Sequence, residues 1–408
     1  MPLELGALGR QLAEGLRVLQ TQDLPRLESR RRQARQILRR ASAEADRWRE
    51  LTLSLSGRTT WLAGVPSGSV LPPVSPPAPP EDYLAIGVDG SQIQPDRHLP
   101  VWSYVLNVGV AVVRYGREPA ARLWSEPTWH FRPEELVLTD PADSSRQARV
   151  EGNILAARRF IRELTKGVEL AEAESPDLPV LVLLDGSLIM WGLAGRRVEG
   201  FVREQLIRQE LLPLFDRLCR LAETGRRVVV AGFISGPRST EVVNALRLFI
   251  CPHDPTACAS CCPSRSAFDG RACDDVGGVT DADLFRTELG PGERTGLFES
   301  QSSVVRELYG THPVRFFYVN AEAEIARVEV PAFLAEKPAL LGLCHALVWD
   351  QVRRGGGYPA VLTEAHEQAV IRGPDRELFR AMLLDELARL GLSEVESPKA
   401  DAKRRRSL

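Results

Sequence analysis

The tripeptide Asp-Gly-Ser occurs twice in this chain, each time directly after a short apolar run. Asp89 follows the apolar residues 84–88, and Asp185 follows the apolar residues 180–184. A carboxylate at the end of a buried strand lies at the rim of a sheet, and the glycine after it lets the backbone turn away. A single Asp-Gly is ordinary turn chemistry. Two of them after two apolar strands favour a site for a hard divalent cation, which prefers oxygen ligands.

A helical acid and a histidine complete the predicted ligand set. Glu151 begins an expected helix between the two strands, although the helix dipole alone also favours an acid there. Glu134 and Glu135 lie nearby and remain alternatives to Glu151. Among the six histidines, His366 is the best candidate for metal coordination or proton transfer. Two divalent ions about 3.5–4 Å apart would share a bridging carboxylate, for which Asp89 is the candidate, and would activate water and neutralise the leaving oxygen.

The elements expected around these residues form a mixed sheet flanked by helices. The first strand is followed by two long strands, a helix, the second apolar strand, another helix and a last strand. We assign the later elements to residues 98–114, 121–131, 150–165, 180–184, 198–224 and 227–234. This order predicts an α/β fold. It resembles the ribonuclease H-like layout, with acids on two adjacent strands and on the intervening helix, and a last ligand on a C-terminal helix.

Composition divides the chain into four parts. Residues 1–64 have the leucine spacing and dense charge of an amphipathic helical arm. Residues 65–81 are rich in proline and predict an extended linker. Residues 82–395 form the main domain, with a cysteine-rich insert at 251–273, and residues 396–408 form a basic tail.

Several motifs, taken in order, resemble the NurA nuclease family in its bacterial form. They are IGVDGS at 86–91, the helix with Glu151, LLDGSL at 183–188, AGFISGPRS at 231–239, FFYVN at 316–320 with ARVEVP at 326–331, and AHEQAVI at 365–371. The resemblance runs across residues 82–371. It implies a ribonuclease H-like fold, manganese-dependent DNA cleavage with 5′ to 3′ exonuclease and single-strand endonuclease activity, a homodimer, and a HerA-type hexameric ATPase partner in DNA end resection and repair.

The resemblance also implies roles for individual residues. The acidic motif positions of the family fall on Asp89 and Asp185, with Glu151 as the intervening acid and His366 as the C-terminal histidine. All four would then be catalytic metal ligands, for Mn²⁺ or Mg²⁺. Further residues in matching motifs are Tyr318, Arg327 and Glu329, which either contact DNA or hold the sheet, and Arg238 is a candidate phosphate contact.

The cysteines gather in the insert. Five of the seven are Cys251, Cys258, Cys261, Cys262 and Cys273. In a cytosolic protein such clustering favours a metal over disulfides, and Cys258 and Cys261 have the spacing of half a zinc knuckle. The other half is irregular, so structural zinc, an iron–sulfur centre and free thiols all remain open.

Charge and hydropathy narrow the function further. The formal net charge of −2 does not indicate a general nucleic-acid binder, so a polyanion would need local basic patches. Two exist, at residues 30–40 and 399–406. A solvated helix face is the alternative interpretation of the first, and a terminal tail is the favoured interpretation of the second. No apolar run approaches the roughly 20 residues that span a bilayer, which predicts a cytoplasmic protein without membrane attachment.

Three other functions stay open from the sequence, one of which is a zinc-stabilised nucleic-acid binder built around the cysteine insert. The chain could be a catalytically silent scaffold that docks an ATPase on DNA, or an RNA-directed nuclease similar to ribonuclease H or Argonaute. A scaffold would not need Asp89 and Asp185 at converging strand ends, so carboxylates more than about 8 Å apart would favour it.

Overall fold

The chain forms two compact units in a computed structural model, which describes residues 4–55, 59, 61–174, 177–195, 197–253, 258, 262 and 271–392. The first unit combines Met1–Pro76 with Ile234–Ser302 and Arg315–Val328. The second combines Pro77–Phe233 with Ser303–Val314 and Glu329–Leu408. This division differs from the predicted one, because the N-terminal helices share a unit with a distant segment of the chain.

The second unit is built on five strands of mixed direction. Strands β2 (Tyr83–Ile93), β3 (Tyr104–Tyr115) and β4 (Ala120–His130) are antiparallel neighbours. Strand β7 (Val180–Asp185) runs parallel to β2, and β8 (Val228–Ile234) runs parallel to β7. The order is therefore β8-β7-β2-β3-β4. This arrangement confirms the predicted mixed α/β fold of ribonuclease H-like type.

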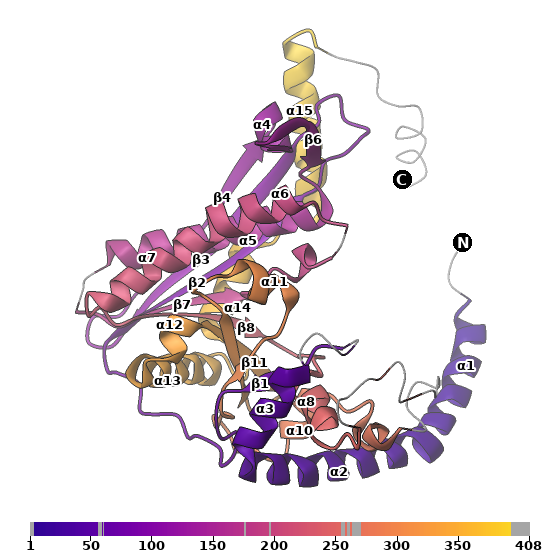
Figure 1. Cartoon of the computed structure of the whole chain (residues 1–408). Helices are drawn as coiled ribbons and strands as arrows, with labels where there is room; N and C mark the ends of the chain where they lie inside the picture. The colour runs from indigo at the N-terminus through magenta and orange to yellow at the C-terminus, as the bar shows by residue number, and fades with distance from the viewer. Residues whose placement is uncertain are drawn as a thin grey trace. The chain divides into compact units, whose positions relative to one another are not determined.

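Helices cover both faces of these strands (Figure 1). Helix α5 (Gly152–Ala173) packs on β2 and β7, and α7 (Leu212–Glu223) packs on α5. Helix α14 (Ala360–Ala369) packs on β2 and β3. Side chains alternate along a strand, and in β2 position 87 faces α14 whereas position 90 faces α5. The two helices therefore lie on opposite faces of the sheet.

Several shorter elements complete the second unit. They are α4 (Pro133–Leu136), β5 (Val137–Asp140), β6 (Asp143–Arg149), the 3₁₀ turn η2 (Trp191–Leu193), α6 (Gly200–Arg203), the π-helical segment η3 (Glu204–Leu211), α11 (Ser303–Leu308), α12 (Ala332–Ala335), α13 (Pro338–Arg354) and α15 (Gly373–Arg389). Helix α5 continues to Ala173, beyond the predicted end at 165. The β5–β6 pair and α15 were not predicted, because their exposed, polar faces give little periodic signal.

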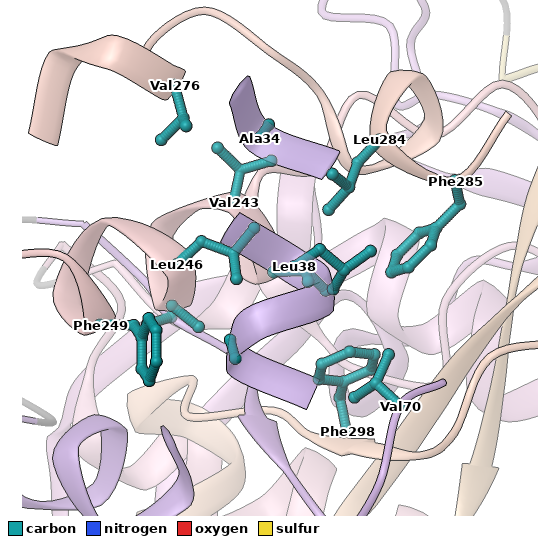
Figure 2. Packing of buried hydrophobic residues seen from close by; sticks show 14 of the residues in the cluster. Ala34, Leu38, Val70, Val243, Leu246, Phe249, Val276, Leu284, Phe285 and Phe298 are labelled. Carbon is teal, nitrogen blue, oxygen red and sulfur yellow. The ribbon is translucent and has the colours of Figure 1, made fainter. Parts of the chain in front are cut away.

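The core of the first unit joins the N-terminal helices to later segments. Helices α2 (Leu24–Ala43) and α3 (Ala45–Leu55) bury apolar side chains against α8 (Glu241–Phe249) and its neighbours. Figure 2 shows Ala34 and Leu38 among Val243, Leu246, Phe285 and Phe298. The ring of Trp48 packs edge-on against that of Phe298, with centroids 6.1 Å apart. These helices are thus part of a core, whereas α1 (Leu5–Val18) buries no residue.

The Pro-rich segment, as far as Pro76, also belongs to this unit. Its first residues form β1 (Val65–Pro66), Val70 lies in the core, and Val74 pairs with Arg294. Apolar residues between the prolines allow this packing, and an edge strand tolerates a proline without an N–H. The other elements of the unit are η1 (Leu19–Asp23), η4 (Ala272–Val276), α10 (Asp281–Phe285), β9 (Phe298–Glu299), and most of β10 (Val314–Asn320) and β11 (Ile325–Pro331), with strand order β1-β9-β10-β11. The unit includes residues 315–328 of the last two strands, so Glu329 of β11 belongs to the second unit.

Candidate metal centre

Three of the four predicted ligands lie together where strand β7 ends. Asp89 was expected to end its own strand, but β2 continues to Ile93 and stays paired with β3, so Asp89 lies inside the strand. Ligand atoms of Asp89, Asp185 and His366 all lie within 4.8 Å of one another. The Nδ1–H of His366 donates to Asp89 Oδ2 over 2.8 Å. The 4.8 Å limit is about twice a metal–oxygen bond of roughly 2.0–2.6 Å. The separation beyond about 8 Å that would favour a silent scaffold is not found.

The first Asp-Gly-Ser fixes the Asp89 carboxylate and attaches β2 to the end of α14. The N–H of Gly90 donates to Asp89 Oδ1 over 2.7 Å, and the Ser91 hydroxyl donates to the carbonyl of Ala369 at the end of α14. Asp89 and Ser91 share the α14 face because they are two residues apart on one strand. Gly90 points toward α5, where a Cβ would lie 2.2 Å from Glu163 Oε1. Only glycine therefore fits between Asp89 and this buried acid.

The second Asp-Gly-Ser ends β7 in a fixed turn. Gly186 has φ +117°, a conformation that favours glycine, and its N–H donates to the carbonyl of Phe233. The Ser187 hydroxyl donates to Glu329 Oε2 over 2.7 Å, and the same oxygen accepts the N–H of Leu188 over 2.9 Å. Glu329 is fully buried. It positions the turn that carries Asp185 rather than contacting solvent.

Helix α14 reaches Asp89 because two glycines let it approach the sheet. A Cβ on Gly87 would lie 2.2 Å from the carbonyl oxygen of Val361, and one on Gly109 would lie 2.2 Å from that of Ala365. Gly109 pairs directly opposite Asp89. The backbone of α14 thus rests on the glycines of β2 and β3, and this contact brings His366 to the carboxylate.

A third acid at the centre is Glu163, which sequence analysis did not single out. Glu163 lies on α5 with a nearly inaccessible side chain, and Arg159 Nε is 3.1 Å from its Oε1. Burial, together with the charges of Asp89 and Asp185, raises the pKa of Glu163 to about 8 despite Arg159. The signal in the sequence was an acid at a position flanked by Phe160, Leu164 and Val168, on the apolar face of its helix.

Glu151 does not join this group, and the prediction for it needs correction. It is the exposed N-cap residue of α5. At 1.5 Å per residue, Glu151 lies about 18 Å along the helix axis from Glu163. The alternatives do not fit either, since Glu135 binds His130 and caps α4, and Glu134 is exposed beside it. The sequence analysis chose the correct helix for the acid, but it chose a residue at the start of the helix instead of Glu163 in its middle.

The donor set fits a divalent cation. Burial and the neighbouring charge of Asp89 raise the pKa of Asp185, while a hydrogen bond from Tyr358 lowers it. Among the described residues, Glu163 Oε1 is buried and receives no hydrogen bond. The Asp89 and Asp185 carboxylates repel each other beside the buried acid of Glu163, and a bound cation would offset this repulsion.

The remaining motif residues belong to the first unit, whereas the metal centre belongs to the second. Tyr318 is buried and donates to Asp281 Oδ2 over 2.7 Å, and Arg327 forms a buried ion pair with Glu241 over 2.5 Å. Both are in the first unit and stabilise its interior. Arg238 is an exposed residue of the loop after β8.

The predicted basic patch on α2 is engaged in salt bridges. Arg31 pairs with Asp283 over 2.6 Å, and Arg39 pairs with Glu288 over 3.0 Å. Arg35 donates to Thr287. These contacts lie within the first unit and support the helix-face interpretation. The second patch, at 399–406, lies outside the described residues.

The cysteine insert is described only in part, and Cys261 lies outside the described residues. Burial and the proximity of Cys262, Cys273 and Cys251 raise the pKa of the Cys258 thiol. Within the described part of the chain, the side chains that come close enough to share a metal ion are those of Asp89, Asp185 and His366, and no such group of cysteines is found there.

Two comparisons place the chain among known proteins. A model of the NurA domain matches residues 83–371. No curated protein matches the chain. A solved structure that resembles it is the crystal structure of LC9-RNase H1, a type 1 RNase H with the type 2 active-site motif. It has 13% identity and a TM-score of 0.19, covering 41% of this chain and 71% of that one. No helix among the described residues has the length and apolar character needed to cross a membrane.

Proposed function

The chain belongs to the NurA family of nucleases, and from this membership and the carboxylate cluster we propose that it is a Mn²⁺-dependent deoxyribonuclease. The observation that carries the proposal is the convergence of Asp89, Asp185 and His366 within 4.8 Å beside the buried Glu163. Asp89, Asp185 and Glu163 would hold Mn²⁺ or Mg²⁺. His366 either completes the ligand set or transfers protons.

The proposed chemistry is hydrolysis of a phosphodiester by a two-metal mechanism. A pair of divalent ions at the cluster would supply an activated water and stabilise the leaving oxygen. Asp89 contacts His366 and its charge acts on Glu163, so Asp89 is the candidate for a carboxylate that both ions would share. The Nδ1–H of His366 faces Asp89, so His366 orients this carboxylate whenever its ring carries that proton. Gly186 and Glu329 keep the Asp185 carboxylate at the strand end.

A nuclease assay with 5′- and 3′-labelled single- and double-stranded DNA tests this proposal. We expect cleavage with Mn²⁺ that falls more than about a hundredfold in Asp89→Asn and in Asp185→Asn, because each removes a charged metal ligand. Glu163→Gln should cause a comparable loss. Glu151→Gln is the matched control on the same helix and should retain activity.

Protein that binds DNA but leaves it intact with both Mn²⁺ and Mg²⁺ would contradict the proposal. RNA and RNA–DNA hybrids in the same assay test the choice of DNA as substrate. Faster cleavage of either one would favour the RNA-directed alternative.

We further propose a cytoplasmic homodimer that acts in DNA end resection with a HerA-type ATPase, as 5′ to 3′ exonuclease and single-strand endonuclease. Family membership supports this proposal. An exposed apolar stripe on α1, with Leu5, Leu12 and Leu16, offers a surface for another subunit. Light scattering of the purified chain, alone and mixed with the ATPase, measures both assemblies. A monomer that leaves the ATPase unbound would contradict them.

Structural zinc in the cysteine insert is a separate proposal. Three described cysteines influence a fourth, since Cys251, Cys262 and Cys273 all raise the pKa of the Cys258 thiol. Deprotonated thiols are zinc ligands, and bound metal would offset their mutual repulsion. Metal analysis should find zinc that is lost in Cys258→Ser. Equal metal content in the variant would contradict the proposal.

A further inference from the structure

A cavity of about 250 Å³ adjoins the metal centre, between the first half of α5 and the loop after β7. Phe160 and Asn153 line it from α5, and Trp191 lines it from η2. Asp185 and Glu163 are also among its lining residues. Pockets that enclose a drug-sized ligand measure roughly 300–1,000 Å³. This smaller cavity suits one flat ring system held next to the carboxylates.

The Trp191 ring is held in a defined position relative to Asp185. Its Nε1–H donates to Ser187 Oγ over 3.0 Å, and the N–H of Ile189 donates to the same oxygen over 3.0 Å. Because Ser187 donates its own proton to Glu329, the hydroxyl uses its donor and both lone pairs. One buried acid thus fixes both the turn after Asp185 and the indole beside it.

The loop is also fastened to α5 on the other side of the cavity. Asn153 Nδ2 donates to the carbonyl of Gly192 over 2.9 Å. A Cβ on Gly192 would lie 3.2 Å from the Asn153 side chain, so glycine permits this close contact. Trp191 nevertheless remains 39% exposed. The ring is preorganised yet open to an incoming ligand.

The chemistry of the lining favours an aromatic ligand attached to an anionic group. Trp191 and Phe160 present ring surfaces, on which nucleobases stack with little dependence on sequence. Asn153 supplies polar atoms at the rim, and Arg159 is a cation beside Glu163. The carboxylates at the adjoining centre repel a phosphate unless a cation intervenes. A nucleotide meets both requirements, since its neutral base can stack on the rings of the cavity while its phosphate lies at the cation held by the carboxylates.

We propose that this cavity binds the unpaired base of the nucleotide next to the scissile phosphate, stacked on Trp191. The inference rests on the proposed nuclease function and specifies its substrate as single-stranded DNA or a frayed end. A base within a duplex must be unpaired and unstacked before it enters such a cavity, and both changes are unfavourable. The pocket therefore discriminates against intact duplex.

The test compares the binding of two strands of equal length, oligothymidylate and the same backbone with abasic sites, in buffer with Ca²⁺. The full-length protein should bind the strand with bases more tightly. The binding ratio is the dissociation constant of the abasic strand divided by that of the strand with bases. Trp191→Ala should reduce this ratio by roughly fivefold to a hundredfold, the range that corresponds to loss of one stacked base. Trp191→Phe should largely restore it, because a ring remains. In cleavage of single strands, Trp191→Ala should raise KM far more than it lowers kcat.

Trp129→Ala is the matched control. Trp129 is 40% exposed on the edge strand β4 and stacks on Phe131, with ring centroids 4.3 Å apart. Its removal should leave the binding ratio intact. The proposal that the base stacks on Trp191 is wrong if Trp191→Ala leaves the binding ratio unchanged, or if Trp129→Ala lowers the ratio instead. Because binding is measured without cleavage, cleavage that persists in Asp89→Asn refutes the nuclease centre separately, whatever the binding ratio.

Discussion

Identical tripeptides serve two different purposes in this site. In the first, Gly90 is required because its missing side chain leaves room for Glu163 against β2. In the second, Gly186 is required because φ is +117°, and open space surrounds it. The serines differ as well, since Ser91 binds the end of α14 and Ser187 binds Glu329. The two aspartates are therefore held by unrelated sets of contacts and meet at one centre.

At the residue scale, the sequence predicted three residues of the candidate site and missed a fourth. Asp89, Asp185 and His366 were identified because each follows a recognisable pattern of apolar neighbours. Glu163 was missed because an acid inside a long helix usually faces solvent. Only the fold reveals that Gly90 leaves space for it.

The buried Glu163 predicts how stability depends on pH in the absence of metal. Its pKa is about 8 in the folded chain, and an unfolded Glu titrates near 4.3. The folded state therefore binds more protons between these values. Stability should be greatest below about pH 4.5, as far as this residue is concerned, and should fall as pH rises through 8. The groups that face Glu163 are Arg159, Asp89 and Asp185.

Urea unfolding in EDTA at several pH values between 5 and 8.5 measures this effect. Glu163→Gln should flatten the decline, because Gln carries no titrating proton, whereas Glu151→Gln should follow the wild-type curve. A parallel decline in Glu163→Gln and wild type would show that other groups cause the pH dependence.

At the scale of elements, the contact between α14 and the sheet determines the position of His366. Gly109→Ala would place a Cβ 2.2 Å from the Ala365 oxygen and from the Ala369 nitrogen, both backbone atoms that cannot rotate away. We expect a destabilisation of about 1–3 kcal/mol, typical of overpacking. Displacement of α14 should also separate His366 from Asp89 and reduce cleavage further than the stability loss explains.

Thermal unfolding and cleavage rate together check this prediction. Gly200→Ala is the control, because nothing lies within 4 Å of its added methyl group. It should change neither quantity appreciably. Unaltered cleavage in a destabilised Gly109→Ala protein would mean that the position of α14 does not govern the site.

Most elements could be predicted from periodicity, and the exceptions share a physical cause. Strands β2, β7 and β8 bury both faces and read as continuous apolar runs. The β5–β6 pair escaped prediction because β6 is almost wholly exposed. The end of α5 was placed too early because Gly167 interrupts its apolar stripe, although Gly167 packs against Val182.

At the scale of the whole molecule, the compact units could not be predicted because their segments are far apart in sequence. The first unit joins residues near the N-terminus to residues beyond 234. A Pro-rich segment normally marks a boundary between domains. Here Val70 lies in the hydrophobic core within that segment, so packing overrides composition.

Two leucines of the N-terminal helices test this assignment. Leu38 is fully buried in the core of the first unit, whereas Leu53 is 42% exposed. Leu38→Ala should destabilise that unit by about 2–5 kcal/mol, as a core truncation does. Leu53→Ala should change stability by less than about 0.5 kcal/mol. Chemical unfolding monitored by tryptophan fluorescence measures both, and equal effects would contradict a core role for α2.

The central claim is that Asp89, Asp185 and Glu163 hold the catalytic cation. The most direct measurement is anomalous diffraction from crystals of the full-length protein grown with Mn²⁺ and a single-stranded oligonucleotide. The account predicts a manganese peak within bonding distance of the Asp89 and Asp185 carboxylates, with Glu163 beside it and Glu151 remote from it. Manganese bound elsewhere, with DNA in place and these carboxylates without metal, would contradict it.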